Sequence, residues 1–209
     1  MVRGVSVTAL AVAAVLVAGC GQKSNGDGTP GTSAGPSGTA SGGPSGSATP
    51  SASAAPAALP DGCGEVLSLD EIDSAVGRPV SGQTIYIKGK AEPKINRIGR
   101  VTCRYGVRKV GNRTVVPLEV GVSSYSDEGS ATSRIEFTVN DQRSHGATPI
   151  EVTLGDTKGT ALLAAASALL IFAKGTTTVA ISITKDVATG DKAKDTLTKL
   201  GTAVVGHLP

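Results

Sequence analysis

The sequence is poor in the side chains that most often carry chemistry or stack on ligands. It has no tryptophan, two phenylalanines and three tyrosines, so it offers few aromatic surfaces on which bases or sugars could stack. Only His145 and His207 could supply an imidazole, and metal sites and general-base catalysis both rely heavily on that group. We therefore expect no nucleic-acid partner, no metal, no cofactor and no catalytic residues, so that the protein is not an enzyme.

Long hydrophobic runs are also scarce. The run from Val5 to Val17 follows Arg3, contains no charge and spans about 13 residues, which is short of the roughly 20 that a membrane-spanning helix needs. It matches the apolar core of a secretory signal. The run closes on Val17-Ala18-Gly19-Cys20, which resembles the lipobox of bacterial lipoproteins. The alternatives are a membrane anchor, or a simple signal with a chance cysteine.

These features predict three regions along the chain. Residues 1–19 are expected to be a signal peptide, and Cys20 to be lipidated, which places the protein on the outer face of the cytoplasmic membrane through its lipid anchor. Residues 20–60 are almost entirely Gly, Ser, Thr, Ala and Pro, a composition that cannot bury enough apolar surface to fold and reads as a flexible tether. Residues 61–209 then form a single extracytoplasmic domain.

Cysteine is scarce, and no pair has the C-x-x-C spacing of redox or zinc motifs. With Cys20 assigned to lipid, Cys63 and Cys103 remain, and an exported domain lies in an oxidising compartment. The sequence therefore predicts a disulfide, whose loop would contribute about 4 kcal/mol in the chain-entropy account. A redox or metal site is the alternative, and it has a poor supply of further ligands.

Hydrophobic periodicity predicts an α+β fold. Ser68 and Glu71 have capping-box spacing before a short helix. Alternating apolar residues predict strands over 84–88, 100–108, 115–123, 150–154 and 179–183, and 161–173 reads as two buried strands with a turn near Ser167. Helical spacing appears over 126–143 and near the C-terminus. We expect a mostly antiparallel sheet of about five to six strands with helices packed on it, arranged as a pseudo-repeat of helix, three strands, helix, three strands, helix.

A resemblance to a known family follows from these residues. The lipobox, the Ser/Thr/Gly/Pro tether, Cys63 before a short helix, Val101-Thr102-Cys103-Arg104-Tyr105 on a strand and the Leu154-Gly155-Asp156 turn resemble an actinobacterial lipoprotein family described as a domain of unknown function. Members often have tryptophan after the second cysteine, where this chain has Arg104-Tyr105. The resemblance implies an exported, lipid-anchored, disulfide-bonded domain and supplies no catalytic residues.

Charge of one sign concentrates in a single stretch of the domain. Nine basic residues lie between Lys88 and Arg113, against Glu92 alone. Arg100, Arg104 and Arg108 fall on one phase of the predicted strand, so we expect them to line one face as a candidate binding stripe. Such a stripe could meet anionic lipid, an envelope polymer or an acidic protein, and the alternative is a solvated strand face.

Two functions from different classes remain open. In the first, the domain is a non-catalytic binding or accessory module for an envelope protein or an anionic envelope component. In the second, it carries an apolar or lipid ligand in a cavity lined by the leucine-rich segment: Leu162, Leu163, Leu169, Leu170 and Ile171. An unliganded structure discriminates between them, because a carrier needs a continuous apolar pocket of several hundred Å³.

Overall fold

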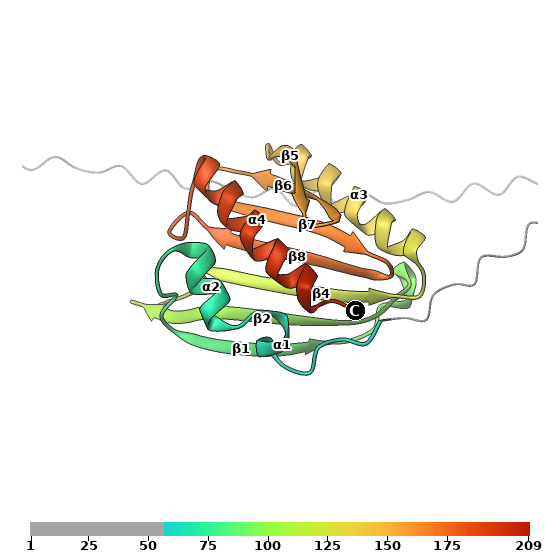
Figure 1. Ribbon diagram of the computed structural model, residues 1–209, viewed down its shortest axis with the longest axis horizontal. Coiled ribbons are helices and arrows are strands. Elements are labelled where there is room, and N and C mark those ends of the chain that lie inside the picture. The colour runs from blue at the N-terminus through green and yellow to red at the C-terminus, as the bar shows by residue number, and fades with distance from the viewer. Residues whose placement is uncertain (1–56) are drawn as a thin grey trace, which may run out of the picture. The chain divides into compact units, whose positions relative to one another are not determined.

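The computed structural model describes residues 57–209. Cys20, the predicted signal peptide and all but the last residues of the predicted tether lie outside the described residues. The described range forms one antiparallel sheet with helices on both of its faces (Figure 1). Within this range, no helix is both long enough and apolar enough to span a bilayer.

The elements follow the chain in two similar halves. The first half contains α1 (Cys63–Val66), α2 (Leu69–Val76), β1 (Gln83–Gly89), the 3-10 turn η1 (Pro93–Ile95), β2 (Arg97–Val110), β3 (Arg113–Val115) and β4 (Leu118–Tyr125). The second contains α3 (Glu128–Ser144), β5 (Thr148–Leu154), β6 (Thr157–Leu163), β7 (Ser167–Lys174), β8 (Thr177–Thr184) and α4 (Gly190–His207). The predicted alternation of helix and strand groups is confirmed, with four strands in each half rather than three.

The sheet has the strand order β1-β2-β4-β8-β7-β6-β5, and every neighbouring pair is antiparallel. Each half is a meander, the two meanders join where β4 pairs with β8, and α3 carries the chain from β4 to the far edge at β5. The α+β class is therefore confirmed. Eight strands replace the expected five to six, partly because Pro117 separates the short β3 from β4.

Local sequence explains where helices begin and end. Ser68 accepts a hydrogen bond from the amide of Glu71, and the Glu71 carboxylate accepts one from the amide of Ser68. This reciprocal cap satisfies two amides at the start of α2. The helix stops at Gly77, whose φ of 79° is the left-handed conformation that glycine adopts without strain.

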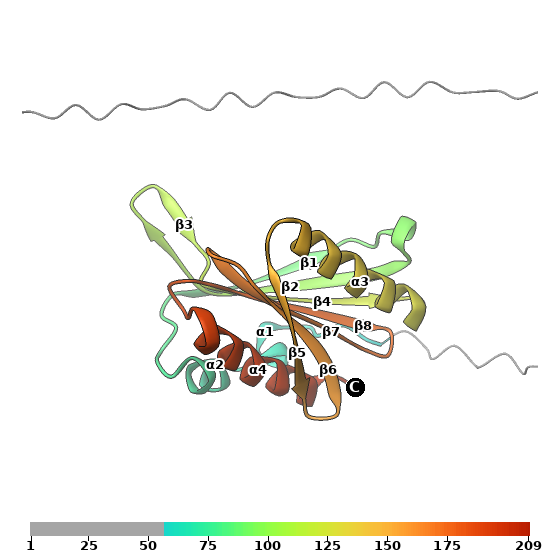
Figure 2. The same cartoon turned by 90° about the horizontal axis from the view of Figure 1, so that it is seen from above.

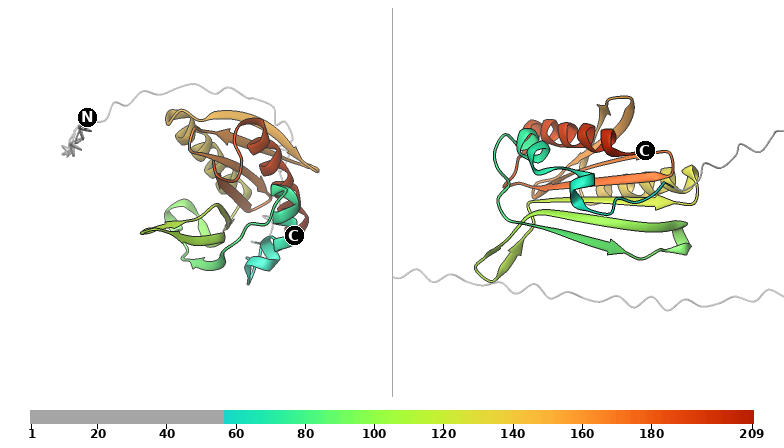
Figure 3. Two further views of the ribbon diagram at one scale, coloured as in Figure 1. Left: turned by 90° about the vertical axis from the view of Figure 1, so that its left-hand side faces the viewer. Right: turned by 60° about the horizontal axis from the view of Figure 1, so that its bottom comes forward.

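The two faces of the sheet are covered unequally. Among the helices of residues 57–209, α1, α2 and α4 lie on one face, which we call the α4 face, and only α3 lies on the other, the α3 face (Figures 2 and 3). The larger core lies on the α4 face, where Leu197 and Leu200 of α4 are fully buried with Leu170 and Ile181. The smaller core lies under α3 and contains Ala147, Leu162 and Ile171, with Ile135 and Val139 packed against them.

The leucine-rich segment does not line a cavity. Leu170 and Leu163 belong to the core of the α4 face, while Leu162, Leu169 and Ile171 belong to the core under α3. Alternation along β6 and β7 sends neighbouring residues to opposite faces, and the segment is filled by packing on both sides. The prediction of a shared ligand cavity lined by these residues is wrong.

Candidate functional site

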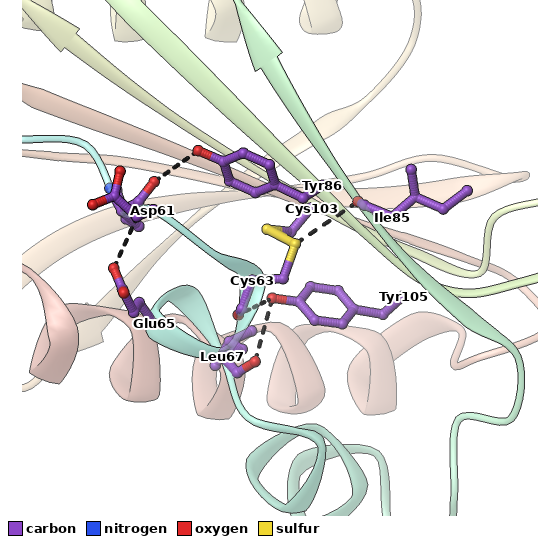
Figure 4. The surroundings of a disulfide bond; sticks show 9 residues. Asp61, Cys63, Glu65, Leu67, Ile85, Tyr86, Cys103 and Tyr105 are labelled. Carbon is purple, nitrogen blue, oxygen red and sulfur yellow. Dashed lines mark hydrogen bonds between the residues drawn. A yellow bond between two sulfur atoms is a disulfide. The ribbon is translucent and has the colours of Figure 1, made fainter.

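The disulfide predicted between Cys63 and Cys103 is present, with the two Cα atoms 5.5 Å apart (Figure 4). It joins α1 to β2 beneath β1. The buried hydroxyl of Tyr105 donates to the carbonyl of Cys63 at 2.8 Å, and the carbonyl of Leu67 lies 3.3 Å away. Burial raises the pKa of Tyr105 far above its usual range, so the phenol stays a donor. This cluster holds α1 in place and has no free reactive group.

The segment before the disulfide is fastened to one end of the sheet. Ala57 donates its amide to the Thr176 hydroxyl at 3.3 Å and accepts from the Ser124 hydroxyl at 2.9 Å. Tyr86 donates to the carbonyl of Pro60 at 2.9 Å, and Leu59 packs against the main core. Packing against the domain thus includes residues 57–60, ahead of the predicted boundary at residue 61.

Arg100 and Arg104 share one face of β2, the α3 face, but Arg108 does not. Between the pairs Ile85↔Arg104 and Gln83↔Val107, β2 contains one residue more than β1. This bulge includes Gly106, whose φ is 69°, and it reverses the alternation of side chains beyond it. Arg108 therefore points to the opposite side, which corrects the prediction that the three arginines form one stripe.

The two remaining arginines have different partners. Arg104 forms an ion pair with Glu119 on β4, with nitrogen and oxygen 2.7 Å apart. The guanidinium of the half-buried Arg100 extends over Gly121, where a Cβ would lie only 2.9 Å from one of its nitrogens. In the part of the chain that the structure describes, Arg100 forms no ion pair. Its guanidinium is therefore a cation on the α3 face of the sheet with N–H donors available to a ligand.

The α3 face is open around Arg100 because α3 covers only part of that face. The helix packs over five strands of the sheet, namely β4, β8, β7, β6 and β5. The strands β1 and β2 therefore lie uncovered beside it (Figures 1 and 2). Ile85 and Ile87, on the edge strand β1, are 37 % and 38 % exposed. By register they share the α3 face with Arg100, Thr102 and Arg104. We call this uncovered surface of β1 and β2 the open face.

One side of α3 forms a wall next to the open face. Ser130, Ser133, Arg134 and Phe137 recur at helical spacing and line a groove of about 550 Å³ with Ile95 and Asn96 of the loop between β1 and β2. Phe137 is 60 % exposed, and the Arg134 guanidinium lies 5.0 Å from its ring centre. The side-chain amide of Asn96 donates from Nδ2 to the Ser130 hydroxyl at 3.0 Å, which connects the loop to the helix.

The acid at the start of α3 serves the helix. Asp127 accepts a hydrogen bond from the amide of Ser130 at 2.7 Å. This bond, helped by the Ser126 and Ser130 hydroxyls, lowers the pKa of Asp127. Although Asp127 also borders the groove, its carboxylate is occupied as a helix cap.

The histidines lie apart from the open face. His145 contacts its own helix at the carbonyl of Asp141, 2.7 Å away, and His207 contacts Glu71 on the α4 face at 2.8 Å. Across residues 57–209, His, Cys, Asp and Glu side chains form no group of three that could hold a metal ion.

The sequence predicted only part of this surface. Ile85 and Ile87 lie on an alternating strand, and alternation alone does not tell whether that row faces a core or solvent. Phe137 falls outside the buried repeat of Ala131, Ile135 and Val139. This offset was a readable signal that an aromatic side chain points away from the core.

Comparisons with known proteins add little to this description. No family model matches the chain, and no curated protein matches it. Among solved structures, the extracellular domain of PknH from Mycobacterium tuberculosis is similar with a TM-score of 0.43 and 8 % identity, over 69 % of this chain and 94 % of that chain. At this TM-score we transfer neither a site nor a role to this chain.

Proposed function

We propose that this protein is a lipoprotein anchored through Cys20 on the outer face of the cytoplasmic membrane, and that its domain is a non-catalytic module that binds an envelope protein. The observation that carries the binding proposal is the open face. It places the exposed Ile85 and Ile87 beside the guanidinium of Arg100, which forms no ion pair within residues 57–209. The partner segment therefore presents apolar side chains and a carboxylate.

The open face has the dimensions of a docking site for one helix or one short ribbon. Two strands at a spacing of roughly 4.8 Å give the open face a width of about 10 Å, which is close to the diameter of a helix with its side chains. The opposite side of the sheet shows the same kind of packing, because α1, α2 and α4 cover the α4 face. A partner segment would complete the layer that α3 begins.

A protein segment fits this site better than a flat anionic surface. The helix α3 lies beside the open face, and we take its axis to stand above the sheet by about the 8–10 Å that separates the axes of packed helices. A planar membrane resting on α3 would therefore remain above the guanidinium of Arg100, which lies along the sheet over Gly121. The isoleucines also favour a partner with apolar side chains over a purely charged polymer.

Crosslinking in intact cells tests the binding proposal. A photoreactive amino acid at Thr102, on the open face, should capture one defined protein, and Arg100→Glu should reduce that capture several-fold. The matched control carries the photoreactive group at Lys199, an exposed residue of α4 on the opposite face. Equal capture from both positions, or capture from Thr102 that ignores Arg100→Glu, would overturn the proposal. Capture of a polymer alone would assign the face to the anionic component.

The anchor has a separate test. Cys20→Ala should move the protein from the membrane fraction to the soluble or secreted fraction, while the protein retains the Cys63–Cys103 disulfide. If the variant stays in the membrane fraction, lipidation at Cys20 is not the anchor.

A further inference from the structure

A second polar pocket lies at the opposite side of the sheet from the open face. It has a volume of about 120 Å³ and is lined by Arg78, Val80, Ser81, Arg108, Pro117 and Asp186, with two further apolar neighbours. The residues come from the segment after α2, the second half of β2, the residue just before β4 and the turn after β8. At roughly 30 Å³ per water molecule, the space suits a group of a few heavy atoms.

Two guanidinium groups border this pocket, and each is held by a backbone carbonyl. Arg78 donates from Nη2 to the carbonyl of Asp186 at 2.6 Å, and Arg108 donates from Nη1 to the carbonyl of Gly106 at 3.3 Å. Within residues 57–209 neither arginine forms an ion pair with a carboxylate. Because a guanidinium has five N–H donors, each retains several after the bond that fixes it.

Two turns of the backbone build the pocket. The bulge at Gly106 reverses the alternation of side chains beyond it and places Arg108 on this side instead of the α3 face. Position 106 favours glycine because a Cβ there would lie 2.6 Å from Val80 and 2.8 Å from Pro117. On the other side, Gly77 ends α2 in the left-handed conformation and turns the chain into Arg78. Two glycine-dependent turns thus bring the arginines to one pocket.

We infer that this pocket is an oxyanion site that takes a phosphate group. Two exposed guanidiniums border one pocket and each retains N–H donors that can bind phosphate oxygens, and charge-assisted hydrogen bonds of this kind are the strong ones. Asp186 also borders the pocket, and its exposed carboxylate reduces the local charge from two positive units to one. This site is separate from the open face, and the inference does not depend on the proposed function.

An NMR titration of the isotopically labelled protein with inorganic phosphate, at constant ionic strength maintained with chloride, tests the site. Saturable shifts should be confined to amides around the pocket, those of Val80, Ser81 and Val187 above all. Arg78→Gln and Arg108→Gln should each weaken binding by roughly tenfold or more, the loss expected for one charge-assisted contact. Arg113→Gln, on the same hairpin and with the same change of charge, should leave it unchanged.

Two further arms sharpen the result. Asp186→Asn keeps the carbonyl that holds Arg78 and removes the opposing charge, so phosphate should bind more tightly. A glycerophosphate diester compared with inorganic phosphate tells whether the group comes from a polymer or lipid headgroup or from the free ion. Shifts that do not saturate, that scatter over surface lysines, or that persist in both arginine variants would overturn the inference. Weaker binding to the Asp186→Asn variant would also overturn it.

Discussion

Removal of the disulfide should cost the domain a large share of its stability. The bond between Cys63 and Cys103 spans a sequence separation of 40 residues, and in the chain-entropy account a closed loop of that size contributes about 4 kcal/mol. Both cysteines are buried, so the double change Cys63→Ala with Cys103→Ala also leaves a small void. We expect the free energy of unfolding to fall by about 3–5 kcal/mol.

Urea unfolding followed by circular dichroism measures this loss. The slope of unfolding free energy against urea should rise, because the unfolded chain without the crosslink exposes more surface. Tyr105→Phe is the control: it keeps the bond but removes the hydroxyl that holds the carbonyls of α1, and it should cost only about 1–2 kcal/mol. A loss below about 1 kcal/mol in the double variant, with no change of slope, would refute the reasoning.

Three further predictions concern the helices. Gly201→Ala should destabilise the domain and lower its Tm, because the new Cβ would lie 2.5 Å from a buried leucine. The cost of this overpacking exceeds the gain in helix propensity. The control Gly206→Ala meets no neighbour within 4 Å and should be neutral or stabilising. Ser68→Ala should cost about 1 kcal/mol in urea unfolding through loss of the cap; an unchanged midpoint would contradict the capping geometry. The hydrogen bond from the Ser68 amide lowers the pKa of Glu71 below its ordinary 4.5. The contribution of the Glu71 carboxylate to the free energy of unfolding is therefore fully present above that value and is lost as pH falls through the lowered folded pKa. Glu71→Gln should flatten this acid dependence of stability, measured by urea unfolding across that pH range.

Much of the fold could be predicted from local patterns. The capping box at Ser68 and the two strands predicted from residues 161–173 depend on residues close in sequence, and both are present. The disulfide was also predictable, because predicted export and the small number of cysteines left few pairings. These features need no knowledge of the tertiary arrangement.

The candidate site was less predictable because it depends on pairing between distant strands. A strict period of two placed Arg108 with Arg104, and a single extra residue near Gly106 reversed that assignment. The bulge is specified by contacts with Val80 and Pro117 from other segments, which a single-strand pattern does not contain. Likewise, the crossover of α3 determines which half of the α3 face is covered. The composition of β1 and β2 does not contain that information.

The disulfide also determines how the domain would respond to mechanical load. A pull applied at Ala57 reaches Cys63 within six residues and passes through the sulfur atoms directly into β2, the second strand of the sheet. The α2 helix and the edge strand β1 lie inside the bridged loop, so the covalent path of that tension bypasses them. Forced extension of the oxidised protein should therefore fall short of the reduced protein by about 140 Å, the length of 40 extended residues.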